Sequence, residues 1–318
     1  MNTVIASILP APEAKGNTLL PINAVERETG ISKELLRMWE RRYHFPNPER
    51  DSQGDRVYPA DQITKLRIIR RLLDAGFRPG KIIGLDLPAL EVLVASSHGN
   101  PSSTLPENLE AELLATLKSH EPNRVRQYLN HHLIRMGLQS FILDLVQYAN
   151  TIVGDAWMSG KIEIYEEHLY TEELQTLIRQ NIGHLQPAAT APHILLATAP
   201  EETHTLGILM VEALLRLEEV DAVSFGAQMP IRDIVQAAQK HKMDVVVLSF
   251  SAAFPANRAI EFLEELRFRL PLSTQIWAGG GGLRNSRRQI EEVQMLSNLQ
   301  SLHQSVSQWR RVKGVKAA

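Results

Sequence analysis

The chain has 318 residues, of which 44% are hydrophobic, and its formal charge is −2 at pH 7. This length accommodates two or three domains with hydrophobic cores, and the near-neutral charge gives no overall attraction to nucleic acid. The absence of cysteine excludes disulfides, thiolate metal sites and cysteine nucleophiles. No run approaches the roughly 18–20 apolar residues that span a membrane, and no secretory signal is present, so we expect a cytoplasmic protein without membrane partners.

The N-terminal part of the chain predicts a small helical domain. Residues 1–18 lack periodicity and are expected to form a flexible tail. Residues 19–87 contain 13 Lys or Arg and 10 Asp or Glu, so this segment is weakly basic on an otherwise acidic chain. A turn at Thr29–Ile31 separates two short helical patterns, and Ser32 can cap the second helix, Lys33–Tyr43. This spacing predicts a helix-turn-helix, although a plain pair of amphipathic helices has the same pattern.

The second helix is expected to have two different faces. Leu35, Leu36 and Trp39 can pack inward, while basic side chains lie on the outer face. The following residues add a Gly-x-Arg-x-Tyr segment at Gly54–Tyr58 and a Gly-Phe-Arg-Pro-Gly-Lys-Ile segment at Gly76–Ile82. Together with the Trp-Glu-Arg-Arg-Tyr run of the helix, these segments resemble the winged helix-turn-helix of the MerR family.

The MerR resemblance implies binding to double-stranded promoter or operator DNA. The side chains that it implicates are Lys33, Arg37, Arg41, Arg42, Tyr43, Arg50, Arg56 and Tyr58. We expect Lys33 and Arg37 to read bases and the other arginines to hold phosphates, which set affinity and register rather than sequence preference. One such head covers a single half-site, so we expect a dimer or tetramer on repeated or palindromic DNA.

The rest of the chain predicts two further domains after a linker. Residues 88–105 contain Pro88 and the polar run Gly99–Ser103, which predict the linker. Residues 106–188 have helical periodicity and predict a four-helix bundle, with helices expected at 109–117, 125–134, 138–156 and 165–182. The fold class is therefore multidomain: an all-α winged helix-turn-helix, a helical bundle, and a C-terminal α/β domain.

Residues 189–318 predict the α/β domain because continuous apolar runs alternate with helical stretches. The expected strands are 193–198, 222–225, 245–250 and 275–278, with a weaker fifth strand near 294–299. Strands of this kind indicate a parallel sheet that is covered on both faces. Right-handed crossovers would give a flavodoxin-like (Rossmann-like) sheet, in which ligands bind at the carboxyl ends of the strands.

Polar and glycine residues follow three of these strands. Glu202, His204 and Gly207 come after the first strand, where an imidazole can ligate a metal and Glu202 can fix its tautomer. The other residues of the pattern are Ser249, Ser251, Gly279 and Gly280. This Glu-x-His-x-x-Gly, Ser, Gly-Gly spacing resembles cobalamin-binding domains. It implies that His204 is the lower axial ligand of cobalt and that the serines and glycines line the nucleotide tail.

A second motif lies in the predicted bundle. Trp157 is followed after nine residues by Glu167 and His168. This pattern resembles the Trp-x9-Glu-His motif of the CarA/CarH/LitR family of cobalamin-dependent regulators and photoreceptors, and implies that these three side chains cover the upper face of adenosylcobalamin. Light-sensing members commonly have a histidine after the tryptophan, whereas this chain has Met158, whose thioether is a poor ligand for oxidised cobalt. His131 or His132 could supply this second imidazole instead, which is a weaker expectation.

The combined resemblance implies a DNA-binding transcriptional repressor, without enzymatic activity, whose oligomeric state responds to adenosylcobalamin and to light. Three alternatives remain open: a light-independent cobalamin sensor, a regulator that uses its C-terminal region only for oligomerisation, and a corrinoid methyl-carrier protein. The predicted DNA-binding head argues against the last of these, because a methyl carrier has no use for it.

Overall fold

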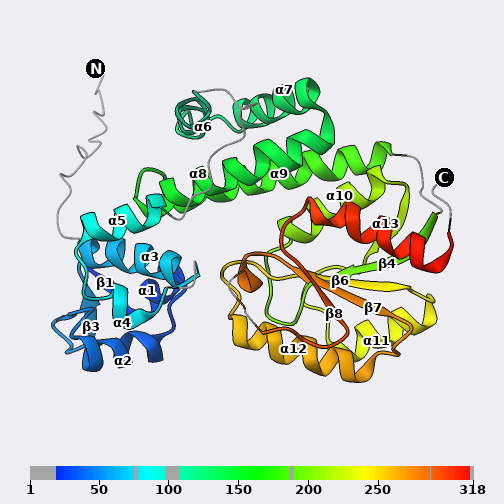
Figure 1. Cartoon of the computed structure of the whole chain (residues 1–318). Coiled ribbons are helices and arrows are strands. Elements are labelled where there is room, and N and C mark those ends of the chain that lie inside the picture. The colour runs from blue at the N-terminus through cyan, green and yellow to red at the C-terminus, as the bar shows by residue number, and fades with distance from the viewer. Residues whose placement is uncertain are drawn as a thin grey trace, which may run out of the picture. The chain divides into compact units, whose positions relative to one another are not determined.

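The computed structural model of the chain (Figure 1) describes residues 19–74, 77–96, 108–185, 190–284, 286 and 288–315. The expectations for a tail at 1–18 and for a linker at 97–105 fall outside these residues. One compact unit comprises residues 19–73 and 77–96, and a second contains the residues from 108 onward. In the described part of the chain, no helix combines the length and apolar character needed to cross a membrane.

The first unit is a helical head with a small antiparallel sheet. Its elements are β1 (Leu20–Pro21), α1 (Ile22–Thr29), α2 (Lys33–Tyr43), β2 (Glu49–Arg50), β3 (Arg56–Tyr58), α3 (Ala60–Asp74), α4 (Pro79–Ile82) and α5 (Leu87–Ser96). Gly30 ends α1 in the left-handed conformation, with φ 65°, which glycine adopts without strain. The Ser32 hydroxyl then accepts a hydrogen bond from the backbone N of Leu35 at 3.3 Å, as expected for the cap of α2. The predicted helix-turn-helix is formed by α1 and α2, and the predicted wing is the antiparallel β2–β3 hairpin.

Two details of the head differ from the sequence-based expectations. Leu36 and Trp39 are buried as predicted, but Leu35 is 39% exposed, because it lies one residue away from the inward stripe of α2. The linker does not begin at residue 88, since α5 extends to Ser96 and its Leu90 is buried in the core of the head. Pro88 lies in the first turn of α5, where a missing N–H breaks no helical hydrogen bond.

The second unit begins with the four-helix bundle. Its elements are α6 (Leu109–Leu117), α7 (Pro122–Ser140), the π-helical segment η1 (Phe141–Val146), α8 (Gln147–Met158) and α9 (Ile164–His184). Gly137 interrupts α7 with φ 74° and ψ 158°, a backbone region that is almost restricted to glycine. After this break the chain remains helical through η1 and α8, which agrees with the single long helix predicted for this stretch.

A five-stranded parallel sheet follows the bundle. Its elements are β4 (Thr190–Ala197), α10 (Leu206–Leu217), β5 (Val220–Ser224), α11 (Ile231–Lys240), β6 (Val245–Ser249), α12 (Ala256–Arg269), β7 (Gln275–Gly279), the short 3-10 helix η2 (Gly281–Leu283), β8 (Val293–Leu296) and α13 (Ser301–Lys313). The strand order is β5-β4-β6-β7-β8, and every neighbouring pair is parallel. Helices α10 and α13 cover one face and α11 and α12 cover the other (Figure 1), as expected for apolar strands.

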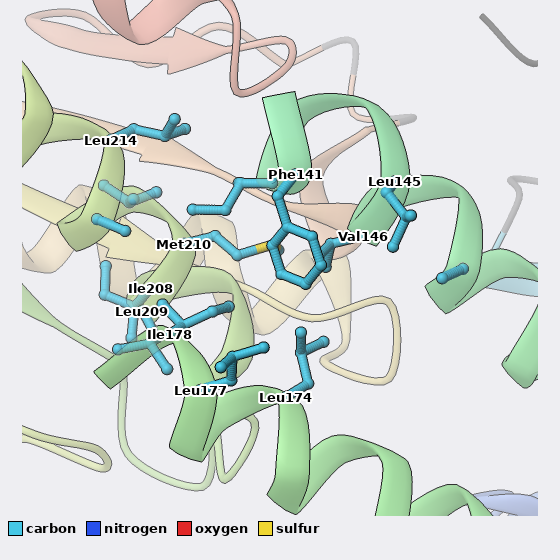
Figure 2. Close-up of a cluster of buried hydrophobic side chains, with 14 of the residues drawn as sticks. Phe141, Leu145, Val146, Leu174, Leu177, Ile178, Ile208, Leu209, Met210 and Leu214 are labelled. Atoms are coloured by element: carbon cyan, nitrogen blue, oxygen red, sulfur yellow. The ribbon is translucent and has the colours of Figure 1, made fainter. Parts of the chain in front are cut away.

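The bundle and the sheet share one hydrophobic core. Figure 2 shows the apolar side chains at this seam: Phe141, Leu145 and Val146 of η1, Leu174, Leu177 and Ile178 of α9, and Ile208, Leu209, Met210 and Leu214 of α10. Helix α10 is therefore buried between the sheet and the bundle. This packing holds the bundle against the face of the sheet that α10 covers.

We expect Phe141→Ala to lower the free energy of unfolding by about 3–5 kcal/mol, because it removes a fully buried ring from this shared core. Urea denaturation followed by circular dichroism would measure the change. Ile134→Ala is the matched control, since Ile134 of α7 is 75% exposed and its loss should cost less than about 0.5 kcal/mol. Equal effects of the two substitutions would contradict the shared core.

Candidate functional site

The strand order of the sheet reverses between β4 and β6. The chain passes from β4 to β5 on one side and then returns to β6 on the other side. In sheets of this kind, ligands bind beyond the carboxyl ends of the strands at this switch point. The loop after β4 carries Glu202 and His204, and the loop after β6 carries Ser251. The structure therefore brings together residues that are almost 50 positions apart in the sequence.

Glu202 is a buried carboxylate that joins these two loops. Its side chain is only 1% exposed. Its Oε1 accepts a hydrogen bond from the backbone N of His204 at 2.9 Å, and its Oε2 accepts one from the backbone N of Ser251 at 2.7 Å. Burial alone would raise the pKa of Glu202, but the hydrogen bonds from His204 and Ser251 outweigh it and hold the pKa below its usual value. The carboxylate is thus ionised and fixed in position.

His204 has one ring nitrogen engaged and one available. Its Nδ1 lies 2.8 Å from Glu202 Oε1 and 3.1 Å from the Ser251 hydroxyl oxygen, while the side chain as a whole is 58% exposed. The hydrogen bond to Glu202 raises the pKa of His204, burial opposes this rise, and the Glu167 charge adds to it. Metal-binding histidines typically donate one N–H to such a carboxylate and use the other nitrogen as ligand. The residues present therefore fit a site for a metal that takes one protein nitrogen.

Close contacts within the protein constrain the glycines of the motif, most strongly at Gly280. A Cβ on Gly207, in the first turn of α10, would lie 2.6 Å from the Ser249 hydroxyl oxygen. A Cβ on Gly279 would lie 3.1 Å from a backbone oxygen of β8, and one on Gly280, with φ 106°, would lie 2.2 Å from the Phe250 carbonyl oxygen. These glycines are predicted to line a ligand's tail, but their nearest constraints are neighbouring strands and loops, which the sequence alone does not place.

Two of the predicted residues of the bundle, Glu167 and His168, lie near the start of α9. Glu167 ends the first turn of α9 and His168 follows it, with Glu167 Oε2 2.5 Å from His168 Nδ1. The other oxygen of Glu167 accepts a hydrogen bond from the Thr171 hydroxyl at 2.8 Å. The Thr205 hydroxyl, next to His204, donates a hydrogen bond to Gln175 Oε1 of α9 at 3.2 Å, so α9 lies beside the His204 loop, and the Glu167 charge contributes to the raised pKa of His204. Trp157 is partly buried near the end of α8.

The two histidines of α7 have other surroundings. His132 is buried, and its ring centroid lies 4.7 Å from that of Tyr128. Burial lowers the pKa of His132, and the opposing acidic group is Glu112 of α6. His131 is exposed on the same helix. His132 is therefore a packed residue facing α6, which argues against its use as a substitute for an imidazole at Met158.

The head exposes most of the predicted basic residues. Arg37, Arg41 and Arg42 of α2 are exposed, with the guanidinium carbon of Arg42 5.4 Å from the centroid of the partly buried Tyr43 ring. On the β2–β3 hairpin, an Arg50 Nη atom donates to the Gly54 carbonyl oxygen at 2.6 Å. The remaining predicted contact at the start of α2, Lys33, forms an ion pair with Glu26 at 3.4 Å. These cations form one basic helix and a hairpin beside it.

Tyr58 is wrongly predicted as a DNA contact, because its side chain is fully buried. Its hydroxyl donates a hydrogen bond to Glu40 Oε1 at 2.7 Å, and Arg56 Nε donates to Glu40 Oε2 at 3.0 Å. Burial first, and then the bond to Glu40, raise the pKa of Tyr58. Glu40, which the sequence reasoning missed, thus joins α2 to the wing. It also lines a cavity of about 340 Å³ with His44, Pro46, Asn47, Pro48, Arg50 and Arg56.

For Tyr58→Phe we expect a loss of about 0.5–1.5 kcal/mol in the stability of the head, because one hydrogen bond to a partly buried carboxylate disappears. DNA affinity at fixed salt should stay unchanged, because a buried hydroxyl reaches no phosphate. Thermal denaturation and gel shifts would measure the two quantities. Weaker DNA binding by a head that remains folded would return Tyr58 to the DNA-contacting residues.

Comparisons with known proteins match each part of this architecture. The MerR HTH family of regulatory proteins matches residues 20–86, and B12 binding domains match residues 109–180 and 192–296. The chain therefore combines a MerR-type winged helix-turn-helix head with a helical bundle and a parallel sheet that both match B12 binding domains.

Two relatives are similar over nearly their whole length. The HTH-type transcriptional repressor CarH of Myxococcus xanthus is 27% identical over 298 residues, which cover 92% of this chain and 97% of CarH. The HTH-type transcriptional repressor CarA of the same organism is 26% identical over 305 residues, 93% of this chain and 98% of CarA. Among solved structures, the monomethylamine corrinoid protein of Methanosarcina barkeri has a TM-score of 0.46 and 18% identity, covering 64% of this chain and 96% of that protein.

Proposed function

We propose that this protein is a repressor whose assembly on promoter DNA is controlled by adenosylcobalamin. The Glu202–His204 pair at the switch point carries the proposal, because it prepares one imidazole for a metal in a chain with a MerR-type head. Both relatives are named as transcriptional repressors, which supports repression rather than activation. Promoter binding implies that the protein works in the cytoplasm.

In the proposed complex, His204 Nε2 would hold the cobalt. The nucleotide tail would be lined by Gly207, Ser249, Ser251, Gly279 and Gly280. The adenosyl side of the cofactor would be held by the bundle residues Trp157, Glu167 and His168. Bound adenosylcobalamin supplies a cobalt–carbon bond that visible light can break, while Glu202 holds the His204 tautomer and the bundle excludes water from above.

Control of assembly follows from the position of α9. This helix carries Glu167 and packs on α10, which begins two residues after His204. We propose that cofactor bound at His204 changes the packing of α9, and through it the surface by which the bundle contacts a second copy of the chain. A ligand shifts an assembly equilibrium only by its difference in affinity for the two states. We propose that the cofactor favours a dimer or tetramer. Such an assembly would place several heads on paired half-sites and increase affinity without any new contact.

The test is size-exclusion chromatography with adenosylcobalamin in the dark and after green light, followed by gel shifts of the same samples. We expect cofactor to co-elute with a larger species that binds DNA in the dark, and a smaller species with weaker DNA binding after light. Colourless protein after incubation with excess cofactor would refute the proposal and leave a regulator that uses its C-terminal region only for assembly.

Met158 favours a second candidate, a cobalamin sensor that does not depend on light. It lies next to Trp157 at the end of α8, where an imidazole would be needed to capture cobalt from above. In this reading the presence of cobalamin is the signal, and illumination only destroys it. Equal regulation of DNA binding in light and in the dark would support this candidate.

We therefore expect illumination of the loaded wild-type protein to leave cobalt with one protein nitrogen, because a thioether is a poor ligand for oxidised cobalt. Absorbance spectra before and after light would measure the ligand set, because oxidised cobalt(III) is diamagnetic and its absorption bands depend on its axial ligands. Met158→His is expected to add the second nitrogen after light. A two-nitrogen spectrum in the wild-type protein would contradict this prediction.

A further inference from the structure

Two consecutive acidic residues connect the same pair of loops from opposite sides. Glu202 points inward and accepts a hydrogen bond from Ser251 N, in the loop after β6. Glu201 has a left-handed backbone conformation, with φ 68°, and its side chain points outward. Its two carboxylate oxygens pair with both terminal nitrogens of Arg258, and one of these contacts is 2.8 Å long. Because Arg258 lies in the first turn of α12, this bidentate pair also ends just beyond β6.

The two connections differ in how easily they can open. The Glu202 side chain is 1% exposed, so its hydrogen bonds are protected from water and salt. Glu201 and Arg258 are 60% and 55% exposed, so their pairing is screened by dissolved ions. The inner connection is therefore the more strongly held of the two, and the outer one is the easier to break.

The outer pair also has a particular position. The loops that it joins flank the switch point between β4 and β6, where a ligand enters such a sheet. These loops already lie close together, as the short approach between Gly207 and Ser249 shows. A cofactor with a nucleotide tail has to separate them further on its way in and on its way out.

We propose that the Glu201–Arg258 ion pair is a latch across the switch point, which slows both the entry and the release of the corrinoid. The latch rests on the proposed corrinoid site and adds a control of its exchange rate. It is separate from the Glu202–His204 pair, so His204 remains held by Glu202 when the latch is open.

The experiment measures rates rather than affinity alone. Association of adenosylcobalamin with the full-length protein in the dark is followed by stopped-flow absorbance, and release is followed by exchange against excess hydroxocobalamin. In Arg258→Gln and in Glu201→Gln we expect both rates to rise about two- to fivefold, the range that one exposed ion pair supports. The dissociation constant should change less than about twofold, because both directions accelerate.

Two comparisons separate a latch from a general disturbance of α12. Arg269 forms an ion pair with Glu265 on the same helix at 2.7 Å, equally exposed but away from the loops, so Arg269→Gln should keep the wild-type rates. The double variant Glu201→Arg/Arg258→Glu should restore slow exchange by reversing the pair. Raising sodium chloride from about 50 mM to about 500 mM should accelerate exchange in the wild type and have little effect in Arg258→Gln.

Wild-type rates in Arg258→Gln, or the same acceleration in Arg269→Gln, would refute the latch. Slower association combined with faster release would also refute it, because that pattern indicates a damaged site. These outcomes differ from failure of the proposed function, in which the wild-type protein itself takes up no cobalamin and its exchange cannot be observed.

Discussion

Replacing His204 with alanine is expected to lower the affinity for adenosylcobalamin by more than about 100-fold. Loss of a residue that only supports a metal ligand typically costs about 10- to 100-fold in metal affinity, and loss of the ligand itself costs at least as much. Absorbance titration would measure the affinity. In the reduced cobalt(II) state, electron paramagnetic resonance should also lose the splitting from the protein nitrogen.

The structure provides a matched control at the other end of the same strand. His193 pairs with Asp221 at 2.8 Å, as His204 pairs with Glu202, but His193 lies near the start of β4 and so at the opposite edge of the sheet. His193→Ala should leave cobalamin binding unchanged. Glu202→Gln should fall between the two, with a loss of about 10- to 100-fold. Tight binding with an intact nitrogen signal in His204→Ala would remove the metal-ligand assignment.

Removing Arg41 and Arg42 together is expected to weaken DNA binding by roughly 10- to 100-fold at physiological salt. Both side chains are exposed on α2, where they can neutralise phosphates. Each lost phosphate contact releases about one fewer counterion, so the slope of log affinity against log salt should shrink by about 2. Fluorescence anisotropy with operator and unrelated duplexes, at several salt concentrations, would measure both quantities.

Two further variants make this prediction specific. Arg269→Ala removes an exposed arginine from α12 of the second unit and should leave DNA binding unchanged. Arg37→Ala should weaken binding to the operator more than to unrelated DNA, because base contacts determine sequence preference. An unchanged salt slope in the double variant would assign DNA binding to another surface of the head.

The sheet and its site were predictable because their signals repeat along the chain. A run such as Val245–Ser249 is apolar at nearly every position, which suits a strand covered on both faces. Each polar motif directly follows such a strand, and a parallel sheet brings the ends of its strands to one edge. The approach of Glu202 to Ser251 therefore followed from the topology.

The wrong predictions concern residues whose surroundings the sequence does not show. Arg56 and Tyr58 are two positions apart in a short strand and therefore lie on the same face of it. Only the contacts of both with Glu40 on α2 show that this face is covered. Likewise, Pro88 signals a break in sequence, but it is compatible with the first turn of α5. Arg258 could not be paired with Glu201 from the sequence, because 57 positions separate two ordinary surface residues.

The burial of α10 on two sides has a consequence for how the C-terminal half can exist. Ile208, Leu209 and Met210 are shielded from water by side chains of η1 and α9 (Figure 2). A proteolytic fragment that starts at β4 would expose this apolar surface of α10 to water and would aggregate. A soluble C-terminal fragment is therefore expected only from cleavage before α6, which keeps the bundle and the sheet together.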